Sequence, residues 1–381
     1  MKGWPTKLLG ELSEMVMGQA PPGGDCNKEG SGTPFVKAGE FGERRPIIRE
    51  WTTNPLKLGR SSDVFVCVVG ATCGKLNLGV DCAIGRSVAA IRPDPSVLNQ
   101  GYLYAFLQGW THRLRSGSQG SAQGVITREM LGRIPIPVPP LREQERIVRL
   151  LDEADELRKL RAQADERAAT LIPALFHEMF GEPTNTKFPV QELNDLVLSE
   201  RPITYGILKP GPDITGGVPY VRVVDIKQNH LHVQQLHKTT REIADQYRRS
   251  TLRPGDILVT IRGTVGRTCV VPDELDGANI TQDTARLAVV DSVEPGYVIE
   301  FLNTPWAQSW MARHMLGQAV KGINLGDLRK LPVPVPGLPV QLQFSERARG
   351  FRELVAQQTM SHKRLDDLFQ SMLHRAFSGE L

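Results

Sequence analysis

The sequence predicts an α+β protein that consists of two β-rich units, each followed by a long helix, with the two helices pairing as an antiparallel coiled coil. Three observations support this prediction. The chain has 381 residues, which is long for one compact domain. Short segments of the first half recur in the same order in the second half, and each half ends in a run with helical periodicity. We expect the β-rich units at 1–140 and 182–337, and the helices at 141–181 and 338–381.

The internal repeat is carried by four pairs of segments. In chain order they are Trp4-Pro5 with Phe188-Pro189, Pro34-Phe35-Val36-Lys37 with Pro219-Tyr220-Val221-Arg222, Asp63-Val64-Phe65-Val66 with Asp256-Ile257-Leu258-Val259, and the proline-rich runs 134–139 and 331–336. The distance between the members of a pair rises along the chain from 184 residues (188 minus 4) to 197 residues (331 minus 134), and it stays at 197 for His177 and His374 (374 minus 177) and for Phe180 and Phe377. Insertions are therefore confined to the first part of each half.

Strands and connectors are predicted within each β-rich unit. The runs 64–69 and 257–261 are short, rich in branched residues and bounded by Gly and Asp, which is typical of buried strands. Each unit ends in alternating prolines, at 135–140 and 332–336. Because proline fixes φ and removes a backbone donor, we expect extended, semi-rigid connectors there. An exposed proline-rich docking ligand is the alternative, which the apolar residues between the prolines disfavour.

Each connector is followed by a long run with apolar residues at steps of three and four, the pattern of a coiled-coil seam. The predicted seam includes Ile147, Leu150, Leu157, Leu171, Phe351, Val355, Leu365 and Phe369. Two seams of equal length in one chain can pair, and antiparallel pairing is the simplest after an intervening globular unit. We expect Pro173 to kink the first helix. The alternative is that each helix packs only on its own unit.

Composition excludes several classes of protein. Hydrophobic residues make up 40% and charged residues 23% of the chain, as in ordinary globular proteins rather than disordered or fibrous ones. No apolar run approaches the roughly 20 residues that span a bilayer, and the N-terminal segment lacks the apolar stretch of a signal peptide, so we expect a cytoplasmic protein without membrane contact. Five cysteines without a Cys-x-x-Cys motif indicate reduced thiols and no metal site.

The motifs of common catalytic sites are absent from the sequence. The segment Gly70-Ala71-Thr72-Cys73-Gly74-Lys75 is one residue short of a phosphate-binding loop, and Leu76 stands where Ser or Thr would meet magnesium. The dinucleotide-binding, zinc-protease and nucleophile-elbow motifs do not occur, and neither does the Asn-Pro-Pro or Pro-Cys type motif of a DNA methyltransferase. The sequence predicts a chain without catalytic activity of its own.

Basic and amide side chains gather around glycine-rich turns of the β-rich units. The two predicted helices together carry a net charge of −1 (−2 and +1), so the +4 of the whole chain leaves +5 on the remainder. Arg can read guanine, Asn and Gln can read adenine, and all of them also bind phosphates. The candidate DNA-binding residues are Lys37, Arg44, Arg45, Lys75, Arg86, Gln119, Gln123, Arg222, Lys227, Arg262, Thr264, Arg267, Gln318, Lys321 and Asn324.

Several of these segments resemble the specificity subunits of type I restriction–modification systems, and the resemblance covers almost the whole chain. The segments that carry it are the tandem β-rich units, the proline bridge with Leu141-Arg142-Glu143-Gln144-Glu145-Arg146-Ile147, the run Gly255–Gly266, Lys321-Gly322-Ile323-Asn324, and the ending Ala376-Phe377-Ser378-Gly379-Glu380-Leu381. The first half departs from the family pattern at 68–74 and 124–127.

The resemblance implies a non-catalytic DNA-recognition subunit. Each β-rich unit would be a target-recognition domain for one half of a gapped, double-stranded DNA site, and the helices would set the gap and dock two methyltransferase subunits. Restriction subunits would complete the complex. S-adenosylmethionine, ATP and Mg²⁺ would be held by the partner subunits, with no cofactor in this chain. The alternatives are a coiled-coil adaptor without DNA contact, a stand-alone bipartite DNA-binding protein, and a self-sufficient DNA-modifying enzyme.

Overall fold

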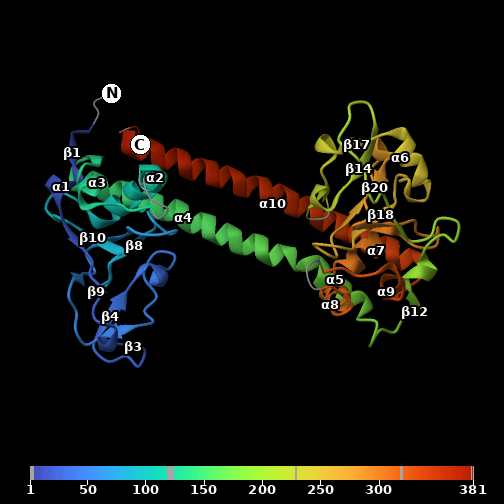
Figure 1. Cartoon of the computed structure of the whole chain (residues 1–381), viewed down its shortest axis with the longest axis horizontal. Helices are drawn as coiled ribbons and strands as arrows, with labels where there is room; N and C mark the ends of the chain where they lie inside the picture. Colours follow the sequence, from blue (N-terminus) through green and yellow to red (C-terminus); the bar gives the residue numbers. More distant parts are fainter. Residues whose placement is uncertain (1–3, 118–123, 228–229, 318–320, 379, 381) are drawn as a thin grey trace. The chain divides into compact units, whose positions relative to one another are not determined.

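The computed structural model of the chain describes residues 4–117, 124–227, 230–317, 321–378 and 380. The chain divides into two compact units (Figure 1). The first consists of Met1–Gln163 and Met360–Leu381, and the second of Ala164–Thr359. Within the described ranges, no helix combines the length and the apolar character that a membrane span requires.

The first unit contains two main sheets. The four-stranded antiparallel sheet has the order β2-β10-β7-β8, and the other sheet has the order β3-β5-β4-β9-β6. The strands are β2 (Ser13–Met17), β3 (Cys26–Asn27), β4 (Thr33–Val36), β5 (Trp51–Thr52), β6 (Leu58–Gly59), β7 (Val64–Cys67), β8 (Leu76–Leu78), β9 (Cys82–Ile84) and β10 (Val88–Pro93). The helices are α1 (Leu9–Leu12), α2 (Gln100–Gly117) and α3 (Arg128–Gly132). Helix α2 packs on the four-stranded sheet and closes the larger core of this unit.

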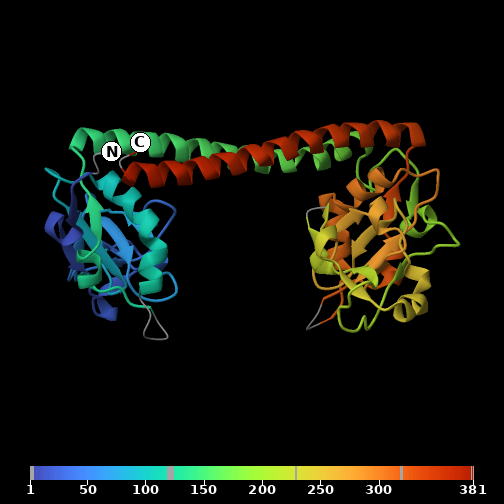
Figure 2. The same cartoon turned by 90° about the horizontal axis from the view of Figure 1, so that it is seen from above.

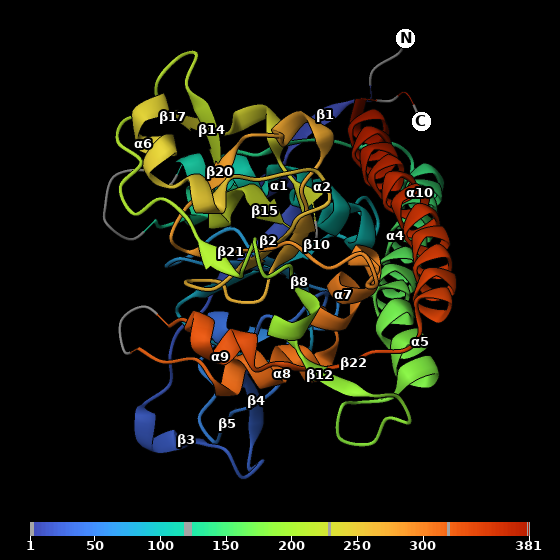
Figure 3. The same ribbon diagram turned by 90° about the vertical axis from the view of Figure 1, so that its right-hand side faces the viewer.

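The second unit repeats the four-stranded sheet in the same order, β13-β21-β18-β19. The strands are β13 (Thr204–Tyr205), β14 (Val218–Val221), β15 (Ile226–Lys227), β16 (His230–Leu231), β17 (His237–Thr239), β18 (Ile257–Thr260), β19 (Thr268–Val270), β20 (Asn279–Ile280) and β21 (Thr284–Leu287). The helices are α6 (Arg241–Gln246), α7 (Pro295–Leu302), α8 (Pro305–Arg313) and α9 (Leu325–Arg329). A smaller sheet, β17-β14-β20, lies close to α6 (Figure 3). The duplicated sheets confirm the tandem repeat.

The two predicted buried strands are present as β7 and β18. Every residue of both strands is buried, because a separate hydrophobic core covers each face of the four-stranded sheet and successive side chains alternate between these cores. The other sheet differs between the units: in the described residues it has five strands in the first unit and three in the second, where β15 and β16 form a separate two-stranded sheet. This difference lies in the part of each half to which the changing repeat distance assigned the insertions.

The proline runs are short strands as well as connectors. Strand β11 (Pro135–Pro137) pairs with β1 (Thr6–Leu8), and β22 (Pro332–Pro334) pairs with β12 (Val190–Glu192), both antiparallel. Proline is tolerated in such two-stranded ribbons because only alternate residues need to donate to the ladder. The start of each half is thereby joined to its end, immediately before the long helix.

The long helices begin where the sequence indicates. Helix α4 spans Leu141–Ala169, α5 spans Leu171–Phe180, and α10 spans Leu338–Ser378. The interruption at Thr170 lies three residues before Pro173, which cannot donate a hydrogen bond to the carbonyl of Ala169. The first helix is therefore interrupted about one turn before the proline at which a kink was predicted.

The contacts between the helices run antiparallel. In the first unit, α4 and α10 lie side by side (Figure 2). Arg158 of α4 pairs with Asp366 of α10 (Nε to Oδ1, 2.6 Å) and lies over the Phe369 ring at 4.5 Å. In the second unit, Phe176 of α5 meets Phe344 of α10, with ring centroids 5.4 Å apart. As the position along α4 and α5 increases, the position of the partner along α10 decreases.

Some residues of the predicted coiled-coil seam are exposed, so the predicted helical phase is partly wrong. Ile147 and Phe369 lie in the core, whereas Leu157 and Leu171 are 56% and 45% exposed. Leu151 is buried, and Arg158 occupies the seam two turns further on. The remaining predicted positions, Leu150, Phe351, Val355 and Leu365, are half-buried. Adjacent leucines at 150 and 151 fit the same apolar pattern in two phases about 100° apart, and an apolar pattern cannot identify a polar seam residue such as Arg158.

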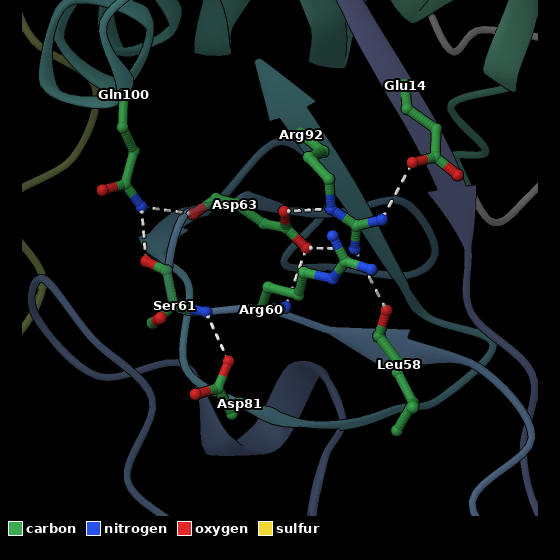
Figure 4. A network of polar contacts seen from close by, with 8 residues as sticks. All are labelled: Glu14, Leu58, Arg60, Ser61, Asp63, Asp81, Arg92 and Gln100. Carbon is green, nitrogen blue, oxygen red and sulfur yellow. Dashed lines mark hydrogen bonds and ion pairs between the residues drawn. The ribbon is translucent and has the colours of Figure 1, made fainter. Parts of the chain in front are cut away.

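A buried aspartate recurs in both units. Asp63 is 0% exposed; it accepts hydrogen bonds from Arg92 Nε (2.9 Å), Arg92 Nη2 (3.0 Å) and the backbone N–H of Arg60 (2.8 Å) (Figure 4). Asp256 accepts two bonds from Arg201 (2.7 Å each) and one from the N–H of Arg253 (2.8 Å). The aspartate occupies the same position of the repeat in both units, whereas the arginine that binds it comes from a different segment in each unit.

We predict that Asp63→Ala lowers the free energy of unfolding by about 3 kcal/mol, because Arg92 loses its buried partner and the Arg60 N–H loses its acceptor. The matched control is Asp81→Ala, which removes an exposed carboxylate that accepts one bond from the Ser61 N–H (Figure 4). We expect the control to change the unfolding free energy by less than about 1 kcal/mol. Urea unfolding measures both, and equal effects would contradict the structural role of Asp63.

Candidate nucleic-acid interface

The turn between β18 and β19 of the second unit brings three candidate residues together. Arg262 and Thr264 are exposed on this turn, and Lys321 is exposed on the segment that runs beside it. The Gly263 N–H donates to the Lys321 carbonyl (3.1 Å), and the Ile323 N–H donates to the Ile261 carbonyl (2.9 Å). The side chains of Arg262 and Lys321 have no hydrogen bond or ion pair within the described residues.

A glycine allows the two segments to approach. A Cβ on Gly322 would lie 2.8 Å from the Ile261 carbonyl oxygen and 2.9 Å from Arg262 Cγ, so any larger residue would push the segments apart. Gly263 and Gly266 have φ of 73° and 89°, which favours glycine in the tight turn. The turn therefore presents two cations and a hydroxyl on one closely packed loop pair, an arrangement that suits a phosphate backbone.

Three further basic candidates of the second unit differ in whether their side chains are free to bind a ligand. Arg267 Nη1 donates to the Ile226 carbonyl (3.1 Å), next to the exposed Lys227. Arg222 forms a two-point ion pair with the buried Asp225 (3.0 and 2.9 Å), and this hydrogen bonding raises the pKa of Arg222. Lys227 is thus available to a ligand, whereas Arg222 is committed to its own turn.

The first unit has the same loop pair with different side chains. Val69 and Val125 form a bridge, and the Gly70 N–H donates to the Gly124 carbonyl (3.3 Å). Arg115 Nε donates to the Cys73 carbonyl on this turn (2.8 Å). The two units therefore share a loop framework but present different residues on it.

Three basic candidates of the first unit form hydrogen bonds or ion pairs within that unit. Lys75 Nζ donates to the Phe41 carbonyl (2.7 Å), and Arg45 Nη1 donates to the Gly79 carbonyl (2.6 Å). Arg44 pairs with Asp152 of α4 (2.8 Å). These contacts fasten the loop that follows β4 to β8 and to the helix. They also place Lys75 away from the role of a phosphate-loop lysine.

Lys37 and Arg86 lie side by side at the ends of β4 and β9. The Gly85 N–H donates to the Val36 carbonyl (2.9 Å), which holds the two turns together. Lys37 binds Glu50, and this hydrogen bond raises the pKa of Lys37. Arg86 is exposed without a hydrogen bond or ion pair among the residues that the structure describes.

Asn324 caps helix α9, where Oδ1 accepts from the Asp327 N–H (2.8 Å) and Nδ2 donates to the Asp327 carboxylate (2.5 Å). Thr127 caps α3 in the same way in the first unit, with Oγ1 accepting from the Met130 N–H (3.2 Å). The candidates Gln119, Gln123 and Gln318 lie outside the described residues. The DNA contact of every candidate stays a prediction.

The cysteines are free thiols, and most of them are buried. Burial raises the pKa of Cys82 and of Cys269 to about 12, so both remain protonated at neutral pH. In the parts of the chain that the structure describes, no group of three or more His, Cys, Asp or Glu residues is arranged to hold a metal ion. The four buried thiols, those of Cys67, Cys73, Cys82 and Cys269, are core residues.

Two buried glutamines and two buried tyrosines were not singled out as contact residues by the sequence analysis. Gln144 and Gln341 stand at the starts of α4 and α10, and Tyr102 and Tyr297 stand in α2 and α7. Each of the four side chains donates a hydrogen bond to a proline carbonyl of the bridge in its own unit. The repeat could have identified the two glutamines from the sequence. They are 197 residues apart (341 minus 144), which is the distance that holds from the proline runs onward.

Comparison with known proteins gives consistent matches. Residues 1–167 match the family model of the type I restriction modification DNA specificity domain. The chain is 28% identical to the type I restriction enzyme EcoBI specificity subunit of Escherichia coli over 342 residues, which covers 81% of this chain and 72% of that protein. It is 24% identical to the EcoKI specificity subunit of Escherichia coli strain K12, over 82% of this chain and 72% of the relative.

Solved structures share the fold. A chain from a structural study of complex assembly and conformational transition in the type I R-M system matches with a TM-score of 0.70 at 19% identity, covering 100% of this chain and 99% of that chain. The HsdS subunit from Thermoanaerobacter tengcongensis matches with a TM-score of 0.50 at 21% identity, covering 100% and 97%. At these identities the likeness concerns the fold alone.

We predict that Arg262→Ala weakens binding of the chain to duplex DNA and reduces by about one the slope of log K against log salt concentration, because one phosphate contact is lost. Arg347→Ala is the matched control: it removes the same charge from an exposed position on α10 of the same unit, and we expect it to leave the slope unchanged. Binding is measured by fluorescence anisotropy from low to moderate salt. An unchanged slope in Arg262→Ala would show that this turn does not contact the phosphates.

Proposed function

We propose that this chain belongs to the type I restriction–modification specificity family, and that it recognises a gapped double-stranded DNA sequence for a complex whose methyl transfer and cleavage reside in other subunits. The chain itself is a non-catalytic DNA-recognition subunit. The observation that carries the proposal is the duplication of one buried framework under two different sets of exposed loop residues. Two units that share a buried framework but differ in their exposed loop residues are suited to reading two different DNA sequences.

Each β-rich unit reads one half of the site. In the second unit, the adjoining loops that carry Arg262 and Lys321, together with Lys227, provide free cations close to hydrogen-bonding side chains. In the first unit, Arg86 beside Lys37 is the corresponding free cation, on a different loop. Contacts with phosphates would position each unit, and side chains on the loops would read base edges.

The long helices act as the spacer between the two half-site readers. Helix α10 has 41 residues, which corresponds to about 60 Å at about 1.5 Å per residue. Such a rod spans more than one turn of duplex, about 34 Å, so two units at its ends would engage DNA with an unread gap between their contacts. The antiparallel contacts of α10 with α4 and α5 support a rod of defined length.

The outer surface of the helices would dock methyltransferase subunits, two of them in the complex that the family resemblance implies. Large apolar residues that the seam does not use remain more than half exposed on both helices. They are Leu157 and Leu160 on α4, and Leu354, Met360 and Leu368 on α10. Apolar surface of this kind favours a protein partner. Restriction subunits would join through that assembly, and S-adenosylmethionine, ATP and Mg²⁺ would be bound by the partners, in the cytoplasm.

We predict that lengthening both helices changes the gap and not the bases read. A four-residue helical insertion after Ala162 in α4 and another after Thr359 in α10 add about 6 Å while nearly preserving helical phase. Both positions lie at the boundary between the two compact units. Because one base pair occupies about 3.4 Å of the duplex axis, the gap should grow by one or two base pairs, and DNA bending would absorb the accompanying rotation.

Mapping of methylated sites in cells that carry the chain and its methyltransferase measures this gap. The wild type and the lengthened variant are mapped side by side, and the two half-sequences are expected to be the same in both. A four-residue insertion in α10 alone is the control, since it disturbs the pairing of the helices and should abolish specific methylation. An active double-insertion variant that keeps the original gap would contradict the spacer role.

A further inference from the structure

The long helices of the two units start with the same buried glutamine. Gln144 and Gln341 are both 0% exposed. The Gln144 side-chain amide donates from Nε2 to the carbonyls of Pro139 and Val97 (2.8 Å each), and its Oε1 accepts from the Asn99 N–H (2.8 Å). One side chain thus joins the proline bridge, the first turn of α4 and the segment before α2.

The second unit repeats this arrangement. Gln341 Nε2 donates to the Pro336 carbonyl (2.7 Å), and Oε1 accepts from the Glu294 N–H (2.9 Å), at the start of α7. Glu294 precedes Pro295 as the N-cap residue of that helix. The glutamine therefore connects the starts of two helices, α7 and α10, through the last proline of the bridge.

A buried tyrosine adds a second contact to each bridge. The Tyr102 hydroxyl donates to the Pro137 carbonyl (2.9 Å), and the Tyr297 hydroxyl donates to the Pro334 carbonyl (2.6 Å). Burial raises the pKa of both tyrosines, so the hydroxyls remain protonated donors. In each unit, a glutamine and a tyrosine hold alternate proline carbonyls, two residues apart, against the body of the domain.

These contacts are directional where apolar packing is not. An apolar side chain of the same volume could fill the site, but it would let the helix start slide or rotate against the domain, since dispersion and burial depend weakly on direction. Hydrogen bonds prefer narrow ranges of distance and angle. Because the donors and acceptors are buried, water cannot replace a lost bond without opening the core.

We propose that Gln144 and Gln341, assisted by Tyr102 and Tyr297, are positioning residues that fix the direction in which each long helix leaves its recognition domain, and that they thereby restrict the complex to one gap length. This inference rests on the proposed function. Rod length alone cannot select one spacing, since a loose joint at either end would let a domain reach neighbouring base pairs. The hydrogen bonds of Gln144 and Tyr102 in one unit, and of Gln341 and Tyr297 in the other, would restrict this movement at both ends of the rod.

The test uses the full complex of this chain with its methyltransferase subunits. Methyl transfer is measured on duplexes that carry both half-sequences with the native gap, with one base pair fewer and with one base pair more. The variants are Gln144→Met and Gln341→Met, which keep the side-chain length and remove the hydrogen bonds. Gln163→Met, an exposed site on α4, is the matched control.

We expect the wild type and Gln163→Met to favour the native gap strongly over both altered gaps. In Gln144→Met and in Gln341→Met this preference should fall about tenfold, while a duplex with either half-sequence scrambled stays unmethylated. Tyr102→Phe, which removes only the hydroxyl donor, should lower the preference by a smaller factor in the same direction, and it provides the readout if a methionine variant does not fold.

Two other outcomes separate the possible failures. If the variants lose activity equally on all three gaps, so that the preference keeps its wild-type value, the glutamines contribute only to stability and the inference is wrong. If the wild type itself methylates a continuous sequence without a gap, the proposed function fails, and the inference fails with it.

Discussion

Each unit depends on one covalent constraint, the proline bridge between its sheets and its long helix. Prolines remove backbone donors from this segment, so the chain cannot be anchored there by an ordinary ladder. The intervening residues supply the ladder instead: the Val138 N–H donates to the Pro5 carbonyl, and the Val335 N–H donates to the Pro189 carbonyl (2.8 and 2.7 Å). The proline carbonyls receive their donors from buried side chains. These hydrogen bonds hold the bridge, and with it the start of the long helix, against the body of each unit.

The comparison between the two units separates framework from surface. The strand order of the four-stranded sheet, the paired bridge and the buried aspartate recur, and each is internal. The arginine that meets the aspartate is Arg92 in one unit and Arg201 in the other, so the requirement is for a buried charge partner rather than for a particular strand. The exposed loop residues differ. Such a division agrees with a duplicated support that reads two different sequences.

Sequence analysis predicted the tandem repeat, the buried strands and the helix starts because these depend on local pattern and on repetition. The helix seam was partly wrong, since Leu150 and Leu151 satisfy the apolar period in two phases and Arg158 enters the seam through Asp366 and Phe369. Free and committed cations could not be distinguished from sequence, because several of the partners lie far along the chain. Arg44, for example, meets Asp152, 108 residues away (152 minus 44).

The central claim is that two units of one chain read two separated blocks of sequence. Single-base mapping of methylated positions in DNA from cells that express this chain with its methyltransferase tests this claim most directly. The account predicts two short specified blocks, separated by a gap of fixed length in which every base occurs, with methylation lost when either block is altered. A single continuous motif, or methylation that depends on one block alone, would contradict it.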